Sequence, residues 1–88
     1  MTDVAFQESA WTEYPWWQTQ DRKTLRRINL LLKATLRDPR HGEGKPEQLG
    51  GDKAGLWSRR IDDRNRLVYR IVGDMVVVAA CRGHYDDK

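Results

Sequence analysis

Three strand-like segments in the second half of the chain constrain its fold more than any other feature. They run from about Leu56 to Ile61, from Arg66 to Val72 and from Met75 to Arg82, and the last is a nearly continuous apolar run. Gly73-Asp74, between the second and third segments, has the composition of a two-residue hairpin turn. Segments joined by such short turns pair as antiparallel neighbours. The sequence therefore predicts an antiparallel meander whose third segment is a buried central strand.

A helix before these strands is predicted over Arg22 to about Arg37. Asp21 is a good N-cap, and Asp38-Pro39 ends the helix because the residue before proline avoids the helical region. Apolar residues at helical spacing form one stripe along it, which Leu31 and Thr35 widen: Leu25, Ile28, Leu32 and Leu36. Leu30 falls toward the other side, where it is either exposed or part of a dimer contact.

An earlier helix is predicted to begin near Ala10 with Ser9 as its cap. Pro15 lies inside it, so the helix is expected to start late, kink or break there. Aromatic residues recur at helical spacing and are interpreted as core rather than as a base-stacking platform: Trp11, Tyr14 and Trp17.

The resulting fold class is α+β, with two N-terminal helices packed on one face of a small antiparallel β-sheet in the order βααβββ. Weak alternation over residues 3–7 accounts for the first strand. An extra short strand is expected at Glu47-Gln48-Leu49, within a long loop rich in Gly, Pro and charge. The 88 residues are enough for one domain, residues 1–88.

Composition narrows the class of protein. No segment is long and apolar enough to cross a bilayer, and no signal peptide is apparent at the start of the chain. The single cysteine, Cys81, fits a reducing compartment, so a cytoplasmic protein is expected. His41, His84 and Cys81 match no metal-ligand spacing, and we expect neither a metal nor a cofactor.

Charge is distributed unevenly along the chain. Residues 1–21 hold four acids and no Lys or Arg, whereas residues 22–70 hold fourteen Lys or Arg against six acids. A segment this basic attracts polyanions, with nucleic acid as the first candidate. Several of these cations are interpreted as the solvated face of the second helix: Arg22, Lys23, Arg26, Arg27 and Lys33.

Some polar residues on the strands and at the chain end could carry chemistry. Arg59, Arg60 and Arg66 lie within apolar strands, where they either line a solvated groove or pair with Asp62 and Asp63. Glu47 alone reads as a solvated loop carboxylate. His84 has the side chain whose ordinary pKa suits acid–base work near neutrality, and Tyr85 could stack on a base or cap the sheet.

Together, four segments of the chain resemble the Txe/YoeB family of addiction-module toxins, the YoeB branch of the RelE/ParE superfamily. The resemblance covers nearly the whole chain in order, and Trp11 and the helix around Ile28 also fit. The segments are Gly44-Lys45-Pro46-Glu47, Gly55-Leu56-Trp57-Ser58-Arg59-Arg60-Ile61, Arg66-Leu67-Val68-Tyr69 and Ala79-Ala80-Cys81-Arg82-Gly83-His84-Tyr85.

The resemblance implies a type II toxin with a RelE-like fold that cleaves mRNA in the ribosomal A site and stops translation. It implies no metal, a YefM-type antitoxin as partner, and a homodimer. By position, Glu47 would be the general base, His84 the general acid, Arg66 the phosphate-stabilising group and Tyr85 a supporting residue. Three basic residues match positions beside the site that would bind RNA: Lys45, Arg59 and Arg60.

Three features depart from the family pattern: Pro15, Gly83 and the extension Asp86-Asp87-Lys88. We expect the extension to be mobile and at most mildly inhibitory. Two other functions remain open, a gyrase-directed toxin of the same fold and a non-catalytic RNA- or ribosome-binding module. The Glu47 and His84 pattern argues against the first, and retained toxicity after losing either residue would favour the second.

Overall fold

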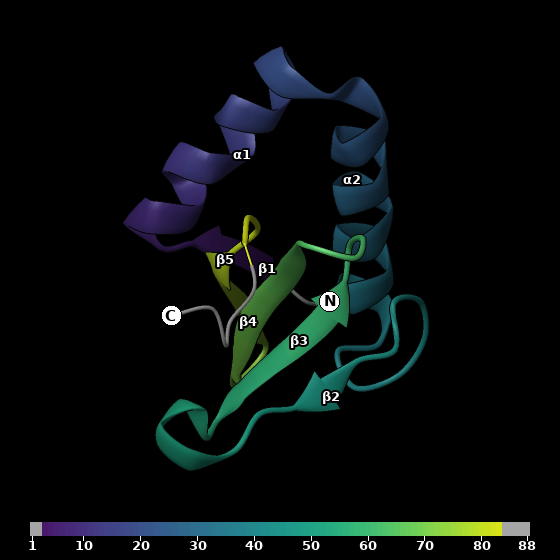
Figure 1. The fold of residues 1–88 in the computed structure, drawn as a ribbon. Coiled ribbons are helices and arrows are strands. Elements are labelled where there is room, and N and C mark those ends of the chain that lie inside the picture. Colours follow the sequence, from purple (N-terminus) through teal and green to yellow (C-terminus); the bar gives the residue numbers. More distant parts are fainter. Residues whose placement is uncertain (1–2, 84–88) are drawn as a thin grey trace.

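The computed structural model describes residues 3–83, so His84, Tyr85 and the extension lie outside the described residues. The elements confirm the predicted order, including the extra short strand expected at Glu47, and a 3₁₀ turn follows it in the long connection (Figure 1). In chain order they are β1 (Asp3–Phe6), α1 (Glu8–Gln20), α2 (Arg22–Arg37), β2 (Glu47–Gln48), η1 (Gly51–Lys53), β3 (Leu56–Arg60), β4 (Arg66–Val72) and β5 (Met75–Ala80).

The strands form one sheet in the order β1-β5-β4-β3-β2. The predicted meander is confirmed, since β3 pairs antiparallel with β4, and β4 with β5. The sheet as a whole is mixed rather than antiparallel, because β1 runs parallel beside β5 with Asp3 opposite Met75. This pairing places β5 between two strands, and Val76 and Val78 are fully buried there, as its apolar sequence predicts.

The first helix begins two residues earlier than expected, at Glu8, and Gln7 rather than Ser9 precedes it. The Ser9 hydroxyl instead donates a hydrogen bond to the carbonyl of Ala79, 3.0 Å away. Pro15 lies within the helix, which continues through it to Gln20. The expected break at Pro15 is therefore absent.

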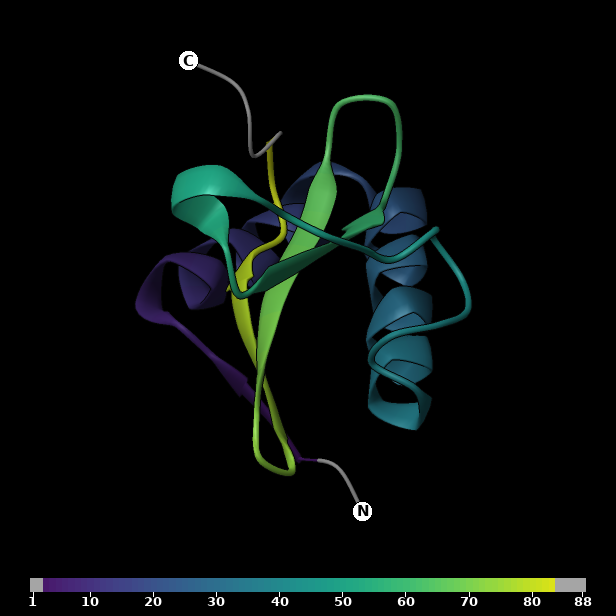
Figure 2. The ribbon, with the colours of Figure 1, turned by 90° about the horizontal axis from the view of Figure 1, so that it is seen from below.

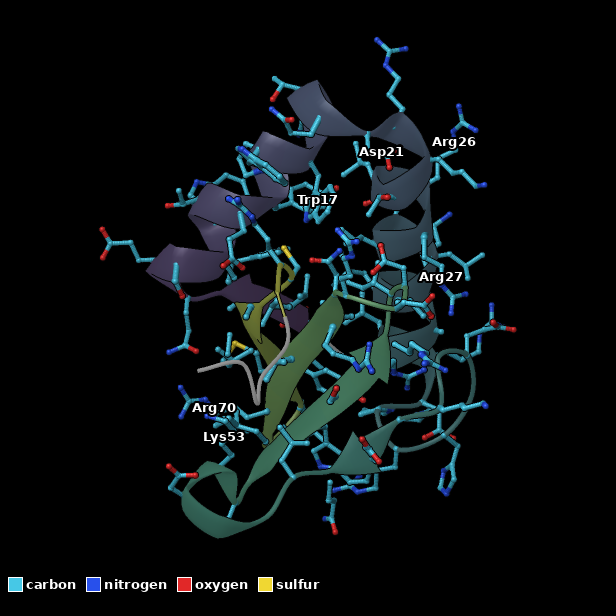
Figure 3. All side chains as sticks on the ribbon, in the orientation of Figure 1. Trp17, Asp21, Arg26, Arg27, Lys53 and Arg70 are labelled. Carbon is cyan, nitrogen blue, oxygen red and sulfur yellow. The ribbon has the colours of Figure 1, made fainter. Side chains whose placement is uncertain are left out.

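Aromatic residues of α1 divide between the core and the surface. Trp17 is buried, and its indole N–H donates to the carbonyl of Cys81 at 2.9 Å. Trp11 is 59% exposed and lies edge-on to Phe6, so its predicted place in the core is wrong. Figure 3 shows Trp17 directed inward, toward the space between α1 and α2.

The second helix matches its predicted bounds, and the Asp21 carboxylate caps it by accepting hydrogen bonds from the backbone N–H groups of Lys23 and Thr24. Ile28, Leu31 and Thr35 are buried against the sheet, while Leu30 is 48% exposed on the far side. Asn29 accepts a 2.6 Å hydrogen bond from the hydroxyl of Tyr14, which ties α2 to α1.

Both helices contribute to one core on the same face of the sheet, and in Figure 2 α1 lies partly behind the strands and α2 beside them. The core lies between these layers and includes Leu67 and Tyr69 of β4, Val76 and Val78 of β5, and Ile61, which directly follows β3. Alternate residues therefore point to the other, open face of the sheet. Within residues 3–83 no helix is long and apolar enough to span a membrane.

Candidate active site

A pocket of about 140 Å³ lies on the open face of the sheet, where β2, β3 and β4 run side by side. Glu47 of β2 is opposite Ser58 of β3, and Arg60 of β3 is opposite Arg66 of β4. Alternation then places these side chains on one face. The pocket collects four of the residues predicted for the site, together with Ser58: Lys45, Glu47, Arg60 and Arg66.

The loop before β2 positions Lys45 and Glu47. The backbone N–H of Arg60 donates to the carbonyl of Gly44 at 2.7 Å, which holds the loop against β3. Gly44 has a φ of 83°, and a Cβ there would lie 2.8 Å from the side chain of Leu31, so only glycine fits. Lys45 follows with a φ of 51°, a left-handed conformation uncommon for a residue with a side chain. Strained conformations of this kind often mark functional sites.

Arg59 does not belong to this surface, and its full burial argues against the predicted RNA-binding role. It has no exposed surface and points to the helix side of the sheet. Its guanidinium donates to the hydroxyl of Tyr69 at 3.1 Å, to the carbonyl of Glu43 at 2.8 Å and to the carbonyls of His41 and Asp38. A buried cation with this many acceptors is a structural group that holds the loop in place.

For the other two strand arginines the sequence left two alternatives, lining a groove or pairing with the turn at Asp62 and Asp63. Arg60 and Arg66 do both, because they line the pocket and also contact that turn. Arg60 lies 3.8 Å from the carboxylate of Asp63, which is 98% exposed. Arg66 is half-buried, and its Nη1 donates to the backbone carbonyls of Asp62 at 2.8 Å and Asn65 at 3.3 Å. These bonds orient the Arg66 guanidinium without neutralising its charge.

The turn that follows β3 is itself tightly held. The Asp62 carboxylate accepts hydrogen bonds from the backbone N–H groups of Arg64 and Asn65, each at 2.8 Å. Burial opposes ionisation of Asp62, but these bonds outweigh it, so the pKa of this carboxyl lies below its usual value. The Asp62 carboxylate therefore stays negatively charged over the physiological pH range.

A larger pocket of about 630 Å³ lies between the end of α2 and the loop, and it shares Lys45 and Arg60 with the smaller one. It also includes Arg27, which was predicted to be solvated but donates to the carbonyls of Arg60 and Ile61 and pairs with Glu43 at 3.5 Å. Asp38 and Glu43 also line this pocket. The smaller pocket carries the candidate chemistry because only it combines Glu47 with Arg66.

Sequence reasoning missed this larger pocket and a third one. The third lies farther along the open face, where Lys53 and Arg70 line a common hollow with Leu56, and Figure 3 shows the two cations close together. Strand alternation, which puts Arg66 and Arg70 on one face of β4, was the signal that could have placed Arg70 on the open face. Among residues 3–83 no cluster of His, Cys, Asp or Glu could hold a metal ion.

His84 and Tyr85 directly follow the last described residue, Gly83. The Gly83 carbonyl accepts a hydrogen bond from the backbone N–H of Arg66 at 2.9 Å, and its own N–H donates to the side-chain oxygen of Asn65 at 2.8 Å. The chain therefore enters its final segment beside Arg66.

Comparison with known proteins assigns the chain to a class. A YoeB/ParE toxin from Agrobacterium tumefaciens superposes with a TM-score of 0.90 at 42% identity, covering 96% of this chain and all of that one. Two Staphylococcus aureus structures, a YoeB dimer and a heterotetrameric YoeB–YefM complex, superpose with TM-scores of 0.87 and 0.86 at 36% identity. They cover 96% and 97% of this chain, and the match spans 98% and 99% of theirs. The fold is thus that of a small bacterial toxin of a toxin–antitoxin pair.

The family follows from the sequence. Residues 6–85 match the model of the YoeB-like toxin of bacterial type II toxin–antitoxin systems. A toxin YoeB from Synechocystis is 50% identical over 82 residues, which are 93% of this chain and 95% of that protein. A toxin YoeB from Escherichia coli K12 is 45% identical over the same share of this chain and 98% of its own. The chain belongs to the YoeB-like toxin family, which confirms the predicted resemblance.

Proposed function

We propose that this toxin is a ribosome-dependent mRNA endonuclease that cleaves in the A site and stops translation. The observation that carries the proposal is the meeting of Glu47 and Arg66, from strands β2 and β4, in one basic pocket on the open sheet face. A carboxylate that can accept a proton, beside a guanidinium that can stabilise negative charge, suits phosphoryl transfer. Lys45 and Arg60 at the rim supply attraction for the RNA backbone.

The proposed reaction begins when Glu47 takes the proton of a ribose 2′-hydroxyl. The 2′-oxygen then attacks the adjacent phosphorus, and Arg66 stabilises the charge of the pentacovalent state. The bond from phosphorus to the 5′-oxygen breaks, and His84 gives that oxygen a proton. Tyr85 supports the site. The products are a 2′,3′-cyclic phosphate and a 5′-hydroxyl, and protein groups account for every proton moved.

We also propose that the chain acts in the cytoplasm, binds an antitoxin of the YefM type and forms a homodimer. The support is similarity to the Staphylococcus aureus YoeB dimer and YoeB–YefM complex over nearly the whole chain. The exposed Leu30 of α2 and Trp11 of α1 are apolar side chains that a partner could cover. Light scattering of the free toxin, and of the toxin mixed with such an antitoxin, measures both assemblies.

The decisive test maps the 5′ ends of a short mRNA incubated with purified toxin, with and without programmed ribosomes. We expect cuts at one position in the A-site codon, only with ribosomes. Glu47→Gln and Arg66→Ala should each slow cleavage by about 100-fold or more, as loss of a general base or a charge-stabilising donor does. Arg26→Ala is the matched control, because Arg26 is an exposed cation of α2 directed away from the sheet (Figure 3).

Each alternative gives a different result. Cuts without ribosomes would mean that the protein is a nuclease whose substrate is free RNA rather than ribosome-bound mRNA. Salt-sensitive ribosome binding without cuts would indicate a binding module. Inhibition of gyrase supercoiling, with intact mRNA, would indicate a gyrase-directed toxin of the same fold. Unchanged cleavage by Glu47→Gln would remove Glu47 from the role of base.

A further inference from the structure

We infer that Lys53 and Arg70 form a second phosphate-binding site, which holds the mRNA strand a few nucleotides away from the phosphate that is cut. This inference rests on the proposed function, because it takes the open sheet face as the surface that receives mRNA. The hollow concerned has a volume of about 320 Å³ and shares no described residue with the pocket of Glu47 and Arg66.

The two cations come from separate elements. Arg70 is an exposed residue of β4, opposite Leu56 of β3 on one side and Val77 of β5 on the other. Lys53 is the last residue of η1, in the loop that joins β2 to β3. Both line the hollow, and Figure 3 shows their side chains close together. Two positive charges from different parts of the chain thus meet at one hollow.

The loop that carries Lys53 is held in place by backbone hydrogen bonds. At its base, the N–H of Leu49 donates to the carbonyl of Leu56 at 2.9 Å, and Leu49 is buried. Within the 3₁₀ turn, the N–H of Lys53 donates to the carbonyl of Gly50 at 3.1 Å. The Lys53 side chain is half-buried, so it has less conformational freedom to lose on binding than a fully exposed lysine.

The charge of this pair is available to a ligand. Within residues 3–83 neither Lys53 nor Arg70 forms an ion pair, since the ion pairs of that range join other residues. Asp52 lines the same hollow with an exposed carboxylate, but among the described residues it too forms no ion pair. Two cations and one carboxylate leave the hollow with a net positive charge, which favours a phosphate.

The pair lies in line with the candidate active site along β4. Arg66 and Arg70 are four residues apart on one face, so at about 3.3 Å per residue their Cα atoms are about 13 Å apart. Another hollow of about 240 Å³ shares Lys53 and Leu56 with the first and extends to Val68, midway between the two arginines. Open space therefore leads from Arg70 toward Arg66.

A single strand of RNA fits this arrangement. With its cut phosphate at Arg66, a strand that follows β4 would bring another phosphate, a few nucleotides away, to Lys53 and Arg70. Contacts to backbone phosphates set the register of a nucleic acid without reading its bases. A second contact would fix the direction of the strand as well as its position, which brings the cut phosphate into a productive geometry. The expected effect of the second site is therefore independent of codon sequence.

The test measures binding of the toxin to ribosomes programmed with an mRNA whose A-site codon is 2′-deoxy. This codon lacks the attacking hydroxyl and stays intact. In a series of such mRNAs, one phosphate at a time in and around the codon is replaced by an uncharged methylphosphonate. Wild type is compared with Lys53→Gln and Arg70→Gln. Arg26→Gln is the matched control, because it removes one exposed positive charge that is directed away from the sheet (Figure 3).

On the fully charged mRNA we expect Lys53→Gln and Arg70→Gln each to weaken binding by about fivefold, as loss of a solvent-exposed charge contact does. The slope of log affinity against log salt should become less steep by about 0.7 for each cation removed. Arg70→Lys should regain most of the affinity, because it restores the charge. Arg26→Gln should bind as wild type.

The methylphosphonate series identifies the contact on the mRNA. For wild type, an uncharged linkage at one position on one side of the cut should weaken binding by a similar factor. Arg70→Gln should show no further loss with that mRNA, because the two changes remove the same interaction. The wild-type series needs no variant, so it tests the site even if a variant does not fold. Sensitivity at the cut phosphate alone would overturn the inference.

The other outcomes are equally distinct. An equal loss for Arg70→Gln on every mRNA would place its contact on the ribosome instead of the mRNA and overturn the inference. Wild-type binding by both Lys53→Gln and Arg70→Gln, or an equal loss for Arg26→Gln, would overturn it too. Failure of the proposed function has a different sign, since natural mRNA would stay uncut, whereas binding to the 2′-deoxy mRNA reports on the second site without any cleavage.

Discussion

Arg59 and Arg60 are adjacent arginines on β3, but their side chains lie on opposite faces of the sheet. Arg60 lies on the open face beside Glu47, whereas Arg59 is fully buried on the helix side. The energetic cost of burying the Arg59 charge is offset by bonds to the Tyr69 hydroxyl and to backbone carbonyls of the loop after α2. The hydroxyl of Tyr69 in turn donates to the carbonyl of Pro39 at 2.6 Å.

Replacing Arg59 by methionine should destabilise the protein strongly. The change leaves buried carbonyls of the loop without donors, and we expect the free energy of unfolding to fall by about 3 kcal/mol. Urea denaturation measures this loss. Arg60→Met, one residue along on the exposed face, should change stability by less than about 0.5 kcal/mol. Equal effects of the two substitutions would show that the buried bonds contribute little.

At the level of the secondary-structure element, α1 is unusual because it contains a proline, Pro15, in its interior. Pro15 is the eighth residue of α1, where it cannot donate the backbone hydrogen bond that a helix interior uses. The helix persists because tertiary contacts hold both sides of the proline. Glu13 accepts the backbone N–H of Cys81 at 2.8 Å, and Trp17 donates to the carbonyl of the same residue. Packing on β5 thus overrides a poor local propensity.

Pro15→Ala should therefore stabilise the toxin. Alanine restores the missing donor and the preferred helical residue, and we expect a gain of about 1–3 kcal/mol, reduced by the greater freedom of the unfolded chain. A rise in melting temperature by circular dichroism is the measurement. Gln18→Ala, at another exposed position of α1, is the control and should shift the melting temperature little. A lower melting temperature for Pro15→Ala would mean that the proline itself is required for the packing of α1 on β5.

At the scale of the whole molecule, stability should fall in alkaline solution. Burial, with a further contribution from the Glu13 carboxylate, raises the pKa of Cys81 from 9.0 to about 12, and burial raises the pKa of Tyr69 as well. Each group ionises more readily in the unfolded chain, so its contribution is fully present below the unfolded pKa and is lost as pH rises toward the folded one.

We expect the free energy of unfolding to decline from about pH 9 upward, by at most about 1.4 kcal/mol per pH unit for each group that titrates. Urea denaturation between pH 8 and 11 measures the decline. Cys81→Ala removes one of the two groups, so its curve should be flatter over this range. Parallel curves for the two proteins would show that the thiol does not contribute.

Periodicity and turn composition were enough to predict most of the fold. The stripe of Leu25, Ile28, Leu32 and Leu36 defined α2, and the Gly73-Asp74 turn fixed the hairpin of β4 and β5. The parallel pairing of β1 with β5 could not be predicted. A four-residue strand pairs through its backbone, and its partner strand is determined by how the two helices that follow it pack on the sheet. The family of the toxin, and the prediction that Glu47 and Arg66 belong to one site, followed from sequence motifs rather than from periodicity.

The fate of Arg59 shows why motif positions do not determine roles. Two adjacent arginines in a strand point to opposite faces, so at most one of them can face the RNA on the open side. Which one does depends on which face the helices cover, and this becomes known only when the sheet and helices are assembled. The hydrogen bond between Asn65 and Gly83 was equally hidden, since the two residues are remote in sequence.

The parallel pairing of β1 with β5 also has a consequence for how a cell makes this protein. The strand synthesised first of the five hydrogen-bonds to the strand synthesised last of the five, and α1 packs on that same late strand. While the chain is still growing, α1 and β1 have no β5 to pack on. Asn65 and Arg66 likewise have no Gly83 to bond until that residue has been synthesised. Assembly of the sheet is thus postponed until β5 has been synthesised, and β1 and α1 cannot reach their final packing before then.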